Sequence, residues 1–391
     1  MHVLIVPSEH FVTQLMPLGG IFQLHQATAL HLAGMRVGVI SGGVVSPRFL
    51  FRSYPYRSEE CLSGVNVYRK YERKYSLQRR SRPCRAVETR VRLGFELYER
   101  YTRAHGRPDV VHAHDVLLSA SIARAIQVRD GIPYGVTEHS SVFAGEGFPE
   151  ESRVIAGDCL RGASFVTAVS RALGRWVARV VDLDGLEIEV LPNVLDQHFV
   201  RDEARPARPD GEPRFLSVGS LDSNKDHATL IAAFARRFGG QNGRLRIAGT
   251  WPLRARLEKL CRRLGVGRQV EFLGHLDRAS VRREMLMAGC LVLTSRVETF
   301  GVVLIEALAC GTPVVATRCG GPEDIVRPED GFLVTPGVPD AIGAAMAEVV
   351  VHSGNYPPER LREGCLRRYG PQAFVKLAAR LYESATSTVS H

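Results

Sequence analysis

The 391-residue chain lacks the features that would mark it as a membrane, secreted or zinc-binding protein. No apolar run approaches the roughly 18–20 residues that a membrane-spanning helix needs. Residues 1–7 have neither a basic start nor a cleavage site, so they indicate a first buried strand and not a signal peptide. The eight cysteines include no Cys-x-x-Cys pair, which argues against a structural zinc site or a disulfide framework. A reduced, cytoplasmic setting is the simplest expectation.

Two motif classes are also absent. No Gly-x-Gly-x-x-Gly turn follows the apolar run at residues 3–6, which counts against an NAD-dependent oxidoreductase. None of the motifs expected of a nucleic-acid reader is present, so the net charge of +10 does not predict a nucleic-acid partner.

Much of the positive excess lies in residues 48–107, where arginines and lysines alternate with tyrosines. The basic residues include Arg69, Lys70, Arg73, Lys74, Arg79, Arg80, Arg82 and Arg85, and the tyrosines are Tyr54, Tyr56, Tyr68, Tyr71 and Tyr75. Two interpretations stay open. One is attraction to an anionic membrane surface, with peripheral binding on its inner face, or to a phosphorylated acceptor. The other is a solvated loop in a protein from an arginine-rich proteome.

Short apolar, β-branched runs alternate with helical patterns along the chain. Such runs indicate parallel strands that are buried on both faces. They occupy residues 3–6, 37–40, 110–112, 134–137, 165–169 and 188–191 in the first half, and 215–218, 245–248, 270–273, 291–294, 313–317 and 332–334 in the second. Two such series predict two doubly wound α/β domains.

The boundary between the predicted domains lies in residues 196–214. Residues 201–213 are polar and rich in proline, as an interdomain connection should be. The expected domains are 1–196 and 197–368, and residues 369–384 have a further helical pattern. Ligands bind outside the carboxyl ends of parallel strands, so the expected site is the cleft between the domains.

The stretch from Ser295 to Gly321 carries the strongest chemical signal. It predicts a strand, a loop containing Glu298, a helix containing Glu306, and a second strand that ends in two glycines. Gly301 allows a tight turn at the helix start, where free N–H groups favour a bound phosphate. Glu306 lies in an apolar helical segment, where a buried carboxylate is costly without a partner. A pair of sugar hydroxyls would be a suitable partner, so the pattern suits a nucleotide sugar.

These residues resemble the signature of the retaining GT-B-fold glycosyltransferases of family 4. The resemblance rests on the two acids with seven residues between them, the following strand that starts at Gly311, and the Gly320-Gly321 turn. Further segments that resemble the family occur in its order at residues 19–21, 137–140, 190–196 and 215–225. The resemblance implies two Rossmann-like domains that face a central cleft. The first binds the acceptor, the second binds the donor, and a last helix at about residues 369–385 returns to the first domain.

The resemblance implies a role for each matching residue. Three side chains are expected to act in catalysis: His139, Lys225 and Glu298. Contacts to the donor are expected from a larger set: Gly19, Gly20, Ser220, Lys225, Glu298, Thr299, Phe300, Gly301, Val302 and Glu306. Within that set, Lys225 would hold the diphosphate, Glu298 the hexose hydroxyls and Glu306 the ribose hydroxyls.

Ser220 departs from the family's pattern, because the family commonly has an arginine at this position. The loss of one of two cations predicts weaker diphosphate binding, and Arg296 in the loop of Glu298 is a candidate replacement. The departure also leaves room for a non-catalytic nucleotide-sugar-binding partner. A GT-B-fold nucleotide-sugar epimerase is another alternative, although the spacing of the acidic pair counts against it.

The leading hypothesis is a retaining, metal-independent hexosyltransferase in glycoconjugate or polysaccharide biosynthesis. It would move a hexose from a nucleoside diphosphate sugar to an acceptor hydroxyl without a cofactor. UDP is favoured because it is the family's commonest nucleotide. Two triplets have spacings that suit metal ligands, Asp182-Leu-Asp184 and His112-Ala-His114, but loop and packing roles are preferred and no metal is predicted.

Overall fold

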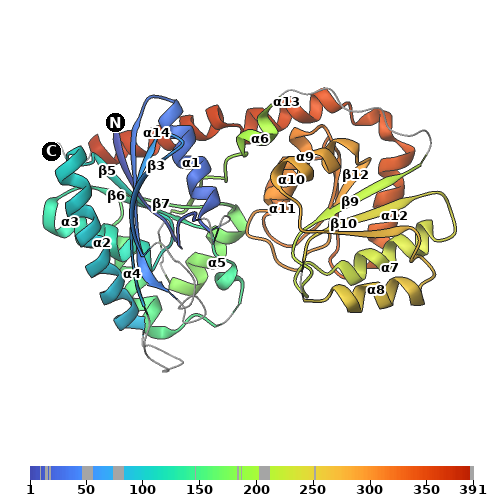
Figure 1. The fold of residues 1–391 in the computed structure, drawn as a ribbon, viewed down its shortest axis with the longest axis horizontal. Coiled ribbons are helices and arrows are strands. Elements are labelled where there is room, and N and C mark those ends of the chain that lie inside the picture. The colour runs from blue at the N-terminus through green and yellow to red at the C-terminus, as the bar shows by residue number, and fades with distance from the viewer. Residues whose placement is uncertain are drawn as a thin grey trace. The chain divides into compact units, whose positions relative to one another are not determined.

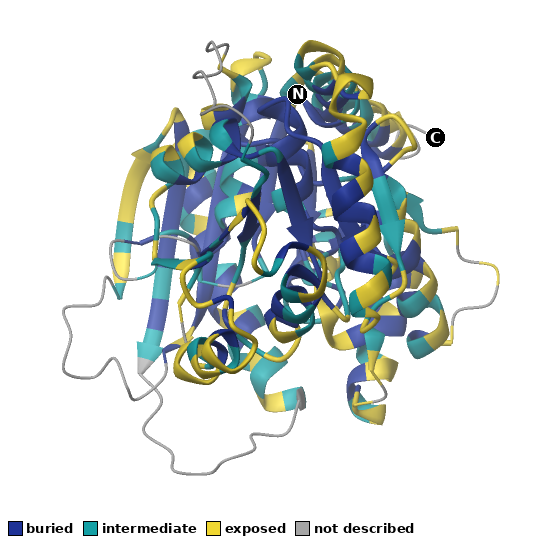
Figure 2. Ribbon diagram, turned by 90° about the vertical axis from the view of Figure 1, so that its right-hand side faces the viewer, coloured by how far each residue is buried: buried dark blue, intermediate teal, exposed yellow. Residues whose placement is uncertain are grey.

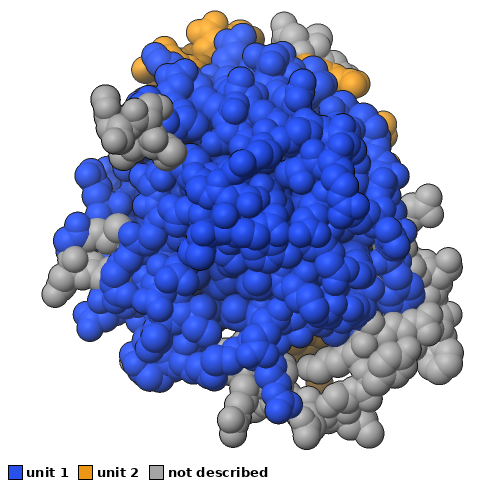
Figure 3. All heavy atoms as spheres, turned by 90° about the vertical axis from the view of Figure 1, so that its left-hand side faces the viewer, with its two compact units in different colours: residues 1–194, 371–391 blue, residues 195–370 orange. Residues whose placement is uncertain are grey.

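The computed structural model describes the chain except for residues 9, 14, 15, 17, 18, 46–55, 74–82, 146, 183, 184, 186, 202–211, 251 and 388–391. The chain divides into two compact units, of which unit 1 comprises residues 1–194 and 371–391 and unit 2 comprises residues 195–370 (Figure 3). The divisions lie two residues before the expected first boundary, at 196, and two residues after the expected second one, at 368.

Unit 1 is built on a sheet of eight strands in the order β3-β4-β2-β1-β5-β6-β7-β8. All neighbouring pairs are parallel except β3 and β4, which are antiparallel. The strands are β1 (His2–Val6), β2 (Arg36–Val45), β3 (Arg57–Leu62), β4 (Val65–Arg73), β5 (Val110–Ala113), β6 (Tyr134–Glu138), β7 (Phe165–Ala168) and β8 (Glu189–Val190). The helices are α1 (Ile21–Leu32), α2 (Pro83–His105), α3 (Leu118–Asp130), α4 (Glu150–Arg161), α5 (Arg171–Val181) and α14 (Pro371–Ser387), with a short 3₁₀ helix at Ser141–Ala144.

The last helix of the chain belongs to unit 1, as the family resemblance implied. α14 packs beside α1 (Figure 1) and its apolar face joins the core that β1 and α1 form. Phe374 and Leu381 lie in the same buried cluster as Val3 and Leu30. Burying such side chains stabilises a fold by about 1.5–3 kcal/mol each, so the helix is held firmly in this unit.

The sequence did not predict β3 and β4, because charged and aromatic residues alternate there in place of an apolar run. β4 turns Val65, Val67, Arg69 and Tyr71 into the core. The Arg69 guanidinium donates to the backbone oxygen of Phe11 at 2.9 Å, and it pairs with Glu60 on β3. The solvated-loop interpretation of residues 48–107 is therefore wrong for the described strands and for α2, whereas Tyr54, Tyr75, Arg79, Arg80 and Arg82 lie outside the described residues.

Unit 2 is built on a sheet of six parallel strands in the order β11-β10-β9-β12-β13-β14, and each of its strands falls on a predicted apolar run. The strands are β9 (Arg214–Val218), β10 (Arg244–Ala248), β11 (Val270–Gly274), β12 (Cys290–Leu293), β13 (Val314–Thr317) and β14 (Gly331–Val334). The helices are α6 (Gln197–Val200), α7 (His227–Phe238), α8 (Arg254–Arg263), α9 (Arg278–Met287), α10 (Val302–Ala309), α11 (Pro322–Ile325), α12 (Pro339–Val351) and α13 (Pro358–Tyr369), with a 3₁₀ helix at Ser353–Asn355.

The strand order reverses between β9 and β12 in unit 2, and between β1 and β5 in unit 1. The loops after such a pair diverge to opposite faces of the sheet and leave a crevice for ligands. Most strand residues are buried, and exposed residues lie in loops and on the outer faces of helices (Figure 2). Within the part of the chain that the structure describes, no helix combines the length and the apolar character that crossing a bilayer requires.

Candidate active site

The loops that follow β9 and β12 are joined to each other in unit 2. The side chain of Asn224 donates to the backbone oxygen of Val297 at 3.0 Å, and it accepts from the N–H of Val297 at 3.1 Å. The N–H of Arg296 donates to the backbone oxygen of Asn224 at 2.8 Å. These bonds fix the loop of Lys225 against the loop of Glu298, so two segments about seventy residues apart in sequence form one surface.

Lys225 and Glu298 form an ion pair across the two loops. Their side chains are only 23% and 13% exposed, so water screens the pair less than it screens a surface pair. The Ser295 hydroxyl also donates to Glu298 Oε1, at 2.7 Å. The structure thus brings together two of the three predicted catalytic residues.

The backbone of Glu298 is fixed as well. Its N–H donates to the backbone oxygen of Cys319 at 3.0 Å, and its own oxygen accepts from the N–H of Gly321 at 2.7 Å. A Cβ atom at Gly321 would lie 2.3 Å from the Cα of Phe300, so only glycine fits this turn. The two glycines after β13 therefore serve to bring the chain close to the Glu298 loop.

α10 begins directly after this loop. Gly301 precedes its first residue with φ of 97°, a left-handed conformation that glycine adopts without strain. Because glycine has no side chain, it cannot cap the first amides of the helix. Thr299 and Phe300 precede Gly301 in the loop, and Val302 is the first helical residue. An eight-residue helix with such a start presents N–H donors and the positive end of its dipole to an anion.

Glu306 has a protein partner that the sequence did not reveal. Its carboxylate is buried and accepts from Arg278 Nη2 at 2.6 Å. Burial raises the pKa of Glu306, the Arg278 guanidinium opposes this rise, and the nearby Asp196 carboxylate adds to it. The carboxylate is therefore not left unpaired in the protein, and Arg278 is a site residue that sequence reasoning missed.

Ser220 and Arg296 are both engaged near the Lys225 loop. The Ser220 hydroxyl donates to Asp222, whose other oxygen accepts from the N–H of Lys225 at 3.0 Å. Arg296 pairs with Asp226 at 3.1 Å and borders a groove of about 690 Å³ between α7 and α8. Ser220 thus helps to shape the loop that carries Lys225, and Arg296 is held at the start of α7.

In unit 1, Glu138 ends β6 and His139 follows it, one strand away from the point where the order reverses. The buried Glu138 carboxylate accepts from the N–H groups of Val116, His139 and Ser140 at 3.0, 2.8 and 2.7 Å. It fixes the backbone that carries His139. Burial and the neighbouring Asp115 raise the pKa of Glu138 to about 7, although the three N–H donors oppose this.

His139 belongs to a group of buried imidazoles. Its Nε2 lies 3.0 Å from Nδ1 of His114, and His112 bonds to the hydroxyls of Tyr382 at 2.8 Å and Thr137 at 2.7 Å. Burial lowers the pKa of His139 to about 4, with Asn193 opposing, and that of His112 to about 3. The rings are therefore neutral near pH 7, and His112 and His114 bind protein groups. The Asp182-Leu-Asp184 triplet lies partly outside the described residues.

Gly19 and Gly20 lie between β1 and α1. Gly20 precedes the first residue of α1 with φ of 62°. A Cβ atom at Gly19 would lie 2.5 Å from the backbone oxygen of His10, which leaves no space for a side chain. Both glycines thus allow the loop to fold tightly at the amino end of α1.

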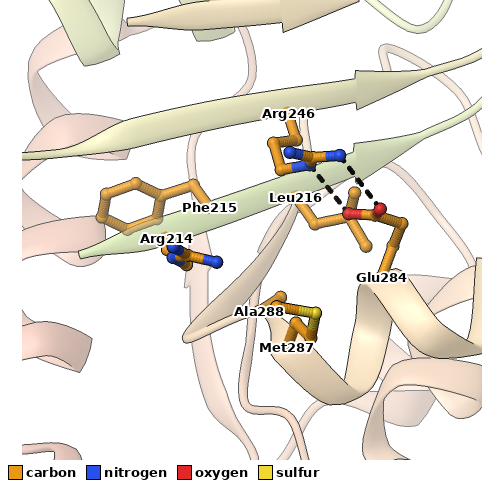
Figure 4. Close-up of a pocket in the computed structure, with 7 residues that line it drawn as sticks. All are labelled: Arg214, Phe215, Leu216, Arg246, Glu284, Met287 and Ala288. Carbon is orange, nitrogen blue, oxygen red and sulfur yellow. Dashed lines mark hydrogen bonds and ion pairs between the residues drawn. The ribbon is translucent and has the colours of Figure 1, made fainter. Parts of the chain in front are cut away.

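A small pocket of about 100 Å³ lies elsewhere in unit 2 (Figure 4). It is lined by Arg214, Phe215, Leu216, Arg246, Glu284, Met287 and Ala288. The polar groups of Arg246 and Glu284 already pair with each other at 2.8 Å. The pocket begins at the first residues of β9, whereas the Lys225 loop follows the last one, so it is not the candidate site.

Comparison with known proteins identifies both halves of the chain. The model of the family described as "Glycosyl transferases group 1" matches residues 200–363, and that of the "Glycosyl transferase 4-like domain" matches residues 20–194. An uncharacterized glycosyltransferase of Methanocaldococcus jannaschii is 27% identical over 375 residues, which cover 91% of this chain and 94% of the relative. The glycogen synthase of Mycobacterium tuberculosis is 28% identical over 338 residues, which cover 83% of this chain and 80% of the relative.

Solved structures share the fold across nearly the whole chain. Sucrose-phosphate synthase from Thermosynechococcus elongatus superposes with a TM-score of 0.76 at 21% identity, covering 99% of this chain and 100% of the other. HepE from Anabaena, solved in complex with UDP, superposes with a TM-score of 0.72 at 18% identity, covering 98% and 100%. The two family models and the fold together show that the chain belongs to the group 1, family 4 glycosyltransferases, with the GT-B fold.

Proposed function

We propose that the protein is a retaining hexosyltransferase that uses a nucleoside diphosphate sugar, with UDP as the favoured nucleotide. Group 1 glycosyltransferases use nucleotide-sugar donors. The observation that carries the proposal is the pairing of Lys225 with Glu298 beside the start of α10. A cation, a polar acceptor and free helix amides in one place suit a diphosphate that is bonded to a sugar.

In this proposal each side chain binds one part of the donor. The Lys225 ammonium moves from Glu298 to the diphosphate, and the amides after Gly301 bind the phosphate oxygens. Glu298 then accepts hydrogen bonds from the hexose hydroxyls, and Glu306 accepts from the ribose hydroxyls. In unit 1, the neutral His139 ring contacts the hexose, while Gly19 and Gly20 provide close backbone contacts.

The reaction needs positioning and charge stabilisation more than a strong base. As the bond to the anomeric carbon breaks, negative charge grows on the leaving diphosphate, where Lys225 stabilises it. The leaving oxygen takes the proton of the acceptor hydroxyl on the same face, so the linkage keeps its configuration. The role of the protein is to hold the acceptor on the face of the hexose that the diphosphate leaves, where the acceptor oxygen bonds to the anomeric carbon.

Two measurements test the proposal. A thermal-shift screen with UDP-, GDP- and ADP-sugars should show the largest rise in melting temperature with a UDP-sugar, because a ligand that binds only the native state stabilises it. Proton NMR of the fresh product from an α-linked donor should show an α-linkage. A β-linked product would refute the retaining mechanism.

A non-catalytic donor-binding partner is the second candidate, and Ser220 favours it because the family's usual cation is missing there. Such a protein would bind the nucleotide sugar but would neither hydrolyse nor transfer it with any acceptor. An epimerase would convert the sugar without an acceptor. Three points stay predictions. They are the use of a hydroxyl acceptor, a role in polysaccharide biosynthesis, and a peripheral contact with an anionic membrane through residues 48–107.

A further inference from the structure

Arg278 joins two buried carboxylates in unit 2. Its Nη2 donates to Glu306 at 2.6 Å and its Nε donates to Asp196 at 2.8 Å. The guanidinium also lies over the ring of Phe199, 4.7 Å from its centre. A planar group held on three sides is well fixed, because each contact restricts a different rotation of the side chain.

Two buried carboxylates share one guanidinium in this group. The side chains of Asp196 and Glu306 are 4% and 5% exposed, and both share the one guanidinium of Arg278. Asp196 also accepts from the N–H of His198 at 2.9 Å as the cap of α6. The His198 ring also lies 3.0 Å from Asp196. The effect of burial on the pKa of Glu306 is opposed by the Arg278 guanidinium, and a buried carboxylate strongly favours donors of hydrogen bonds.

Two other charged side chains on the elements that pack against α10 are engaged elsewhere. On α13, Arg362 donates to the backbone oxygen of Ala309 at 2.8 Å. On α11, Glu323 accepts from the N–H of Cys319 at 3.1 Å. Arg278 on α9 and Asp196 before α6 are thus the two charges that act on the Glu306 carboxylate.

We propose that Arg278 is a positioning residue for Glu306: anchored on Asp196 and Phe199, it keeps the carboxylate ionised and oriented for the ribose diol of the donor nucleotide. This rests on the proposed function, in which Glu306 binds the ribose. A diol offers two O–H donors, and an ionised carboxylate accepts both, whereas a protonated one has an O–H of its own to place. Arg278 thereby sets the nucleotide affinity through Glu306.

The test is calorimetric titration of UDP into the full chain at about pH 8 and about pH 6. Arg278→Gln keeps hydrogen-bond donors but removes the charge, so burial and Asp196 then favour the protonated Glu306. We expect an affinity at least about tenfold below that of the wild type at the lower pH, with a smaller loss at the higher pH. Arg283→Gln on the exposed side of the same helix is the matched control and should bind as the wild type does.

A second variant covers the case in which Arg278→Gln does not fold. Adding Asp196→Asn leaves one buried carboxylate in place of two, which reduces the cost of losing the guanidinium. The double variant should keep the pH-dependent loss, because Glu306 is still buried without a cation. Affinity equal to that of the wild type at both pH values, or higher because Arg278 blocks the ribose, would overturn the proposal.

Glu306→Gln separates this proposal from the proposed function. If it weakens UDP binding while Arg278→Gln does not, the role of Arg278 is refuted and the donor site stands. If it leaves UDP binding unchanged, the ribose role of Glu306 is refuted and the proposal for Arg278 falls with it. The formation of an α-linked product then still tests the transferase function, because that measurement does not depend on Glu306.

Discussion

The two units place different ionisable groups near the ends of their strands. Unit 1 buries neutral rings, with His112 bonded to hydroxyls and His114 bonded to His139. Unit 2 holds partly buried ion pairs, with Lys225 on Glu298 and Arg278 on Glu306. A neutral polar group suits sugar hydroxyls, whereas fixed charges suit a diphosphate and a diol that needs a strong acceptor. The difference teaches that two similar parallel sheets can present neutral rings in one unit and ion pairs in the other.

Among the substitutions considered, loss of the Lys225 side chain should have the largest effect on turnover. In Lys225→Ala, turnover should fall by at least about a hundredfold, the scale seen when a preorganised charge stabiliser is removed. The loss should persist at saturating donor, because charge on the leaving diphosphate grows in the transition state. Steady-state kcat at saturating UDP-sugar measures it.

Arg296→Ala is the control for Lys225. Arg296 is 65% exposed and pairs with Asp226, so its loss should change kcat by less than a few-fold. If Lys225→Ala kept its turnover and Arg296→Ala lost it, Arg296 would be the residue that holds the diphosphate. The proposed role of Lys225 would then be refuted.

Substitutions of Glu306 and Glu298 in unit 2 should affect the binding of UDP and of UDP-sugar differently. Glu306→Ala removes a charged hydrogen bond to the ribose, so the affinity for UDP itself should fall about tenfold or more. Glu298→Ala should leave UDP affinity nearly unchanged but weaken the intact UDP-sugar, because Glu298 is proposed to contact only the hexose. Calorimetry with UDP and with UDP-sugar distinguishes them, and equal losses for both ligands in both variants would contradict the separate roles.

Acid should destabilise unit 1 through its neutral histidines. Burial lowers the pKa of His112, His114 and His139 below the usual 6.5, so the unfolded chain binds protons that the folded chain does not. The contribution of the neutral rings to the free energy of unfolding is complete above about pH 6.5. It is lost as the pH falls toward the pKa values of the folded state, by up to about 1.4 kcal/mol per histidine per pH unit.

Hydrogen exchange of β5 amides, corrected for the intrinsic rate, measures this loss, with β12 amides as the comparison in unit 2. His112→Gln should reduce the pH slope at β5. Equal slopes at β5 and β12 in the wild type would show that the buried rings of unit 1 do not control its stability in acid.

The sequence predicted the strands of unit 2 because each contains a short apolar run. It missed β4, where Arg69 and Tyr71 point into the core, because burial of a guanidinium depends on partners such as Glu60 and the oxygen of Phe11 that only the fold brings near. Local motifs likewise indicated Glu298 and Lys225 but gave no sign that the two side chains pair.

Arg278 was missed for the same reason. Its partners Glu306 and Asp196 lie 28 and 82 residues away in the sequence, and a lone arginine at the start of a helix has no pattern of its own. A buried acid in an apolar helix did signal a missing partner. The sequence could not say whether a ligand or an arginine supplies it, because that depends on how α9 packs against α10.

Substitution of Ser220 should have the smallest effect on donor binding and turnover. It tests whether the charged residues of unit 2 hold the donor without the serine hydroxyl. Its hydroxyl bonds to Asp222, which in turn orders the N–H of Lys225, so Ser220→Ala removes one exposed hydrogen bond and no charge. Such a bond contributes about 0.5–1.5 kcal/mol, which limits the loss of UDP-sugar affinity to about tenfold and leaves kcat within a few-fold. Asp222→Ala removes the acceptor for both Ser220 and Lys225 and should cost more. If Ser220→Ala abolished turnover while Asp222→Ala did not, the serine would contact the donor directly, and it would replace the family's arginine in function as well as in position.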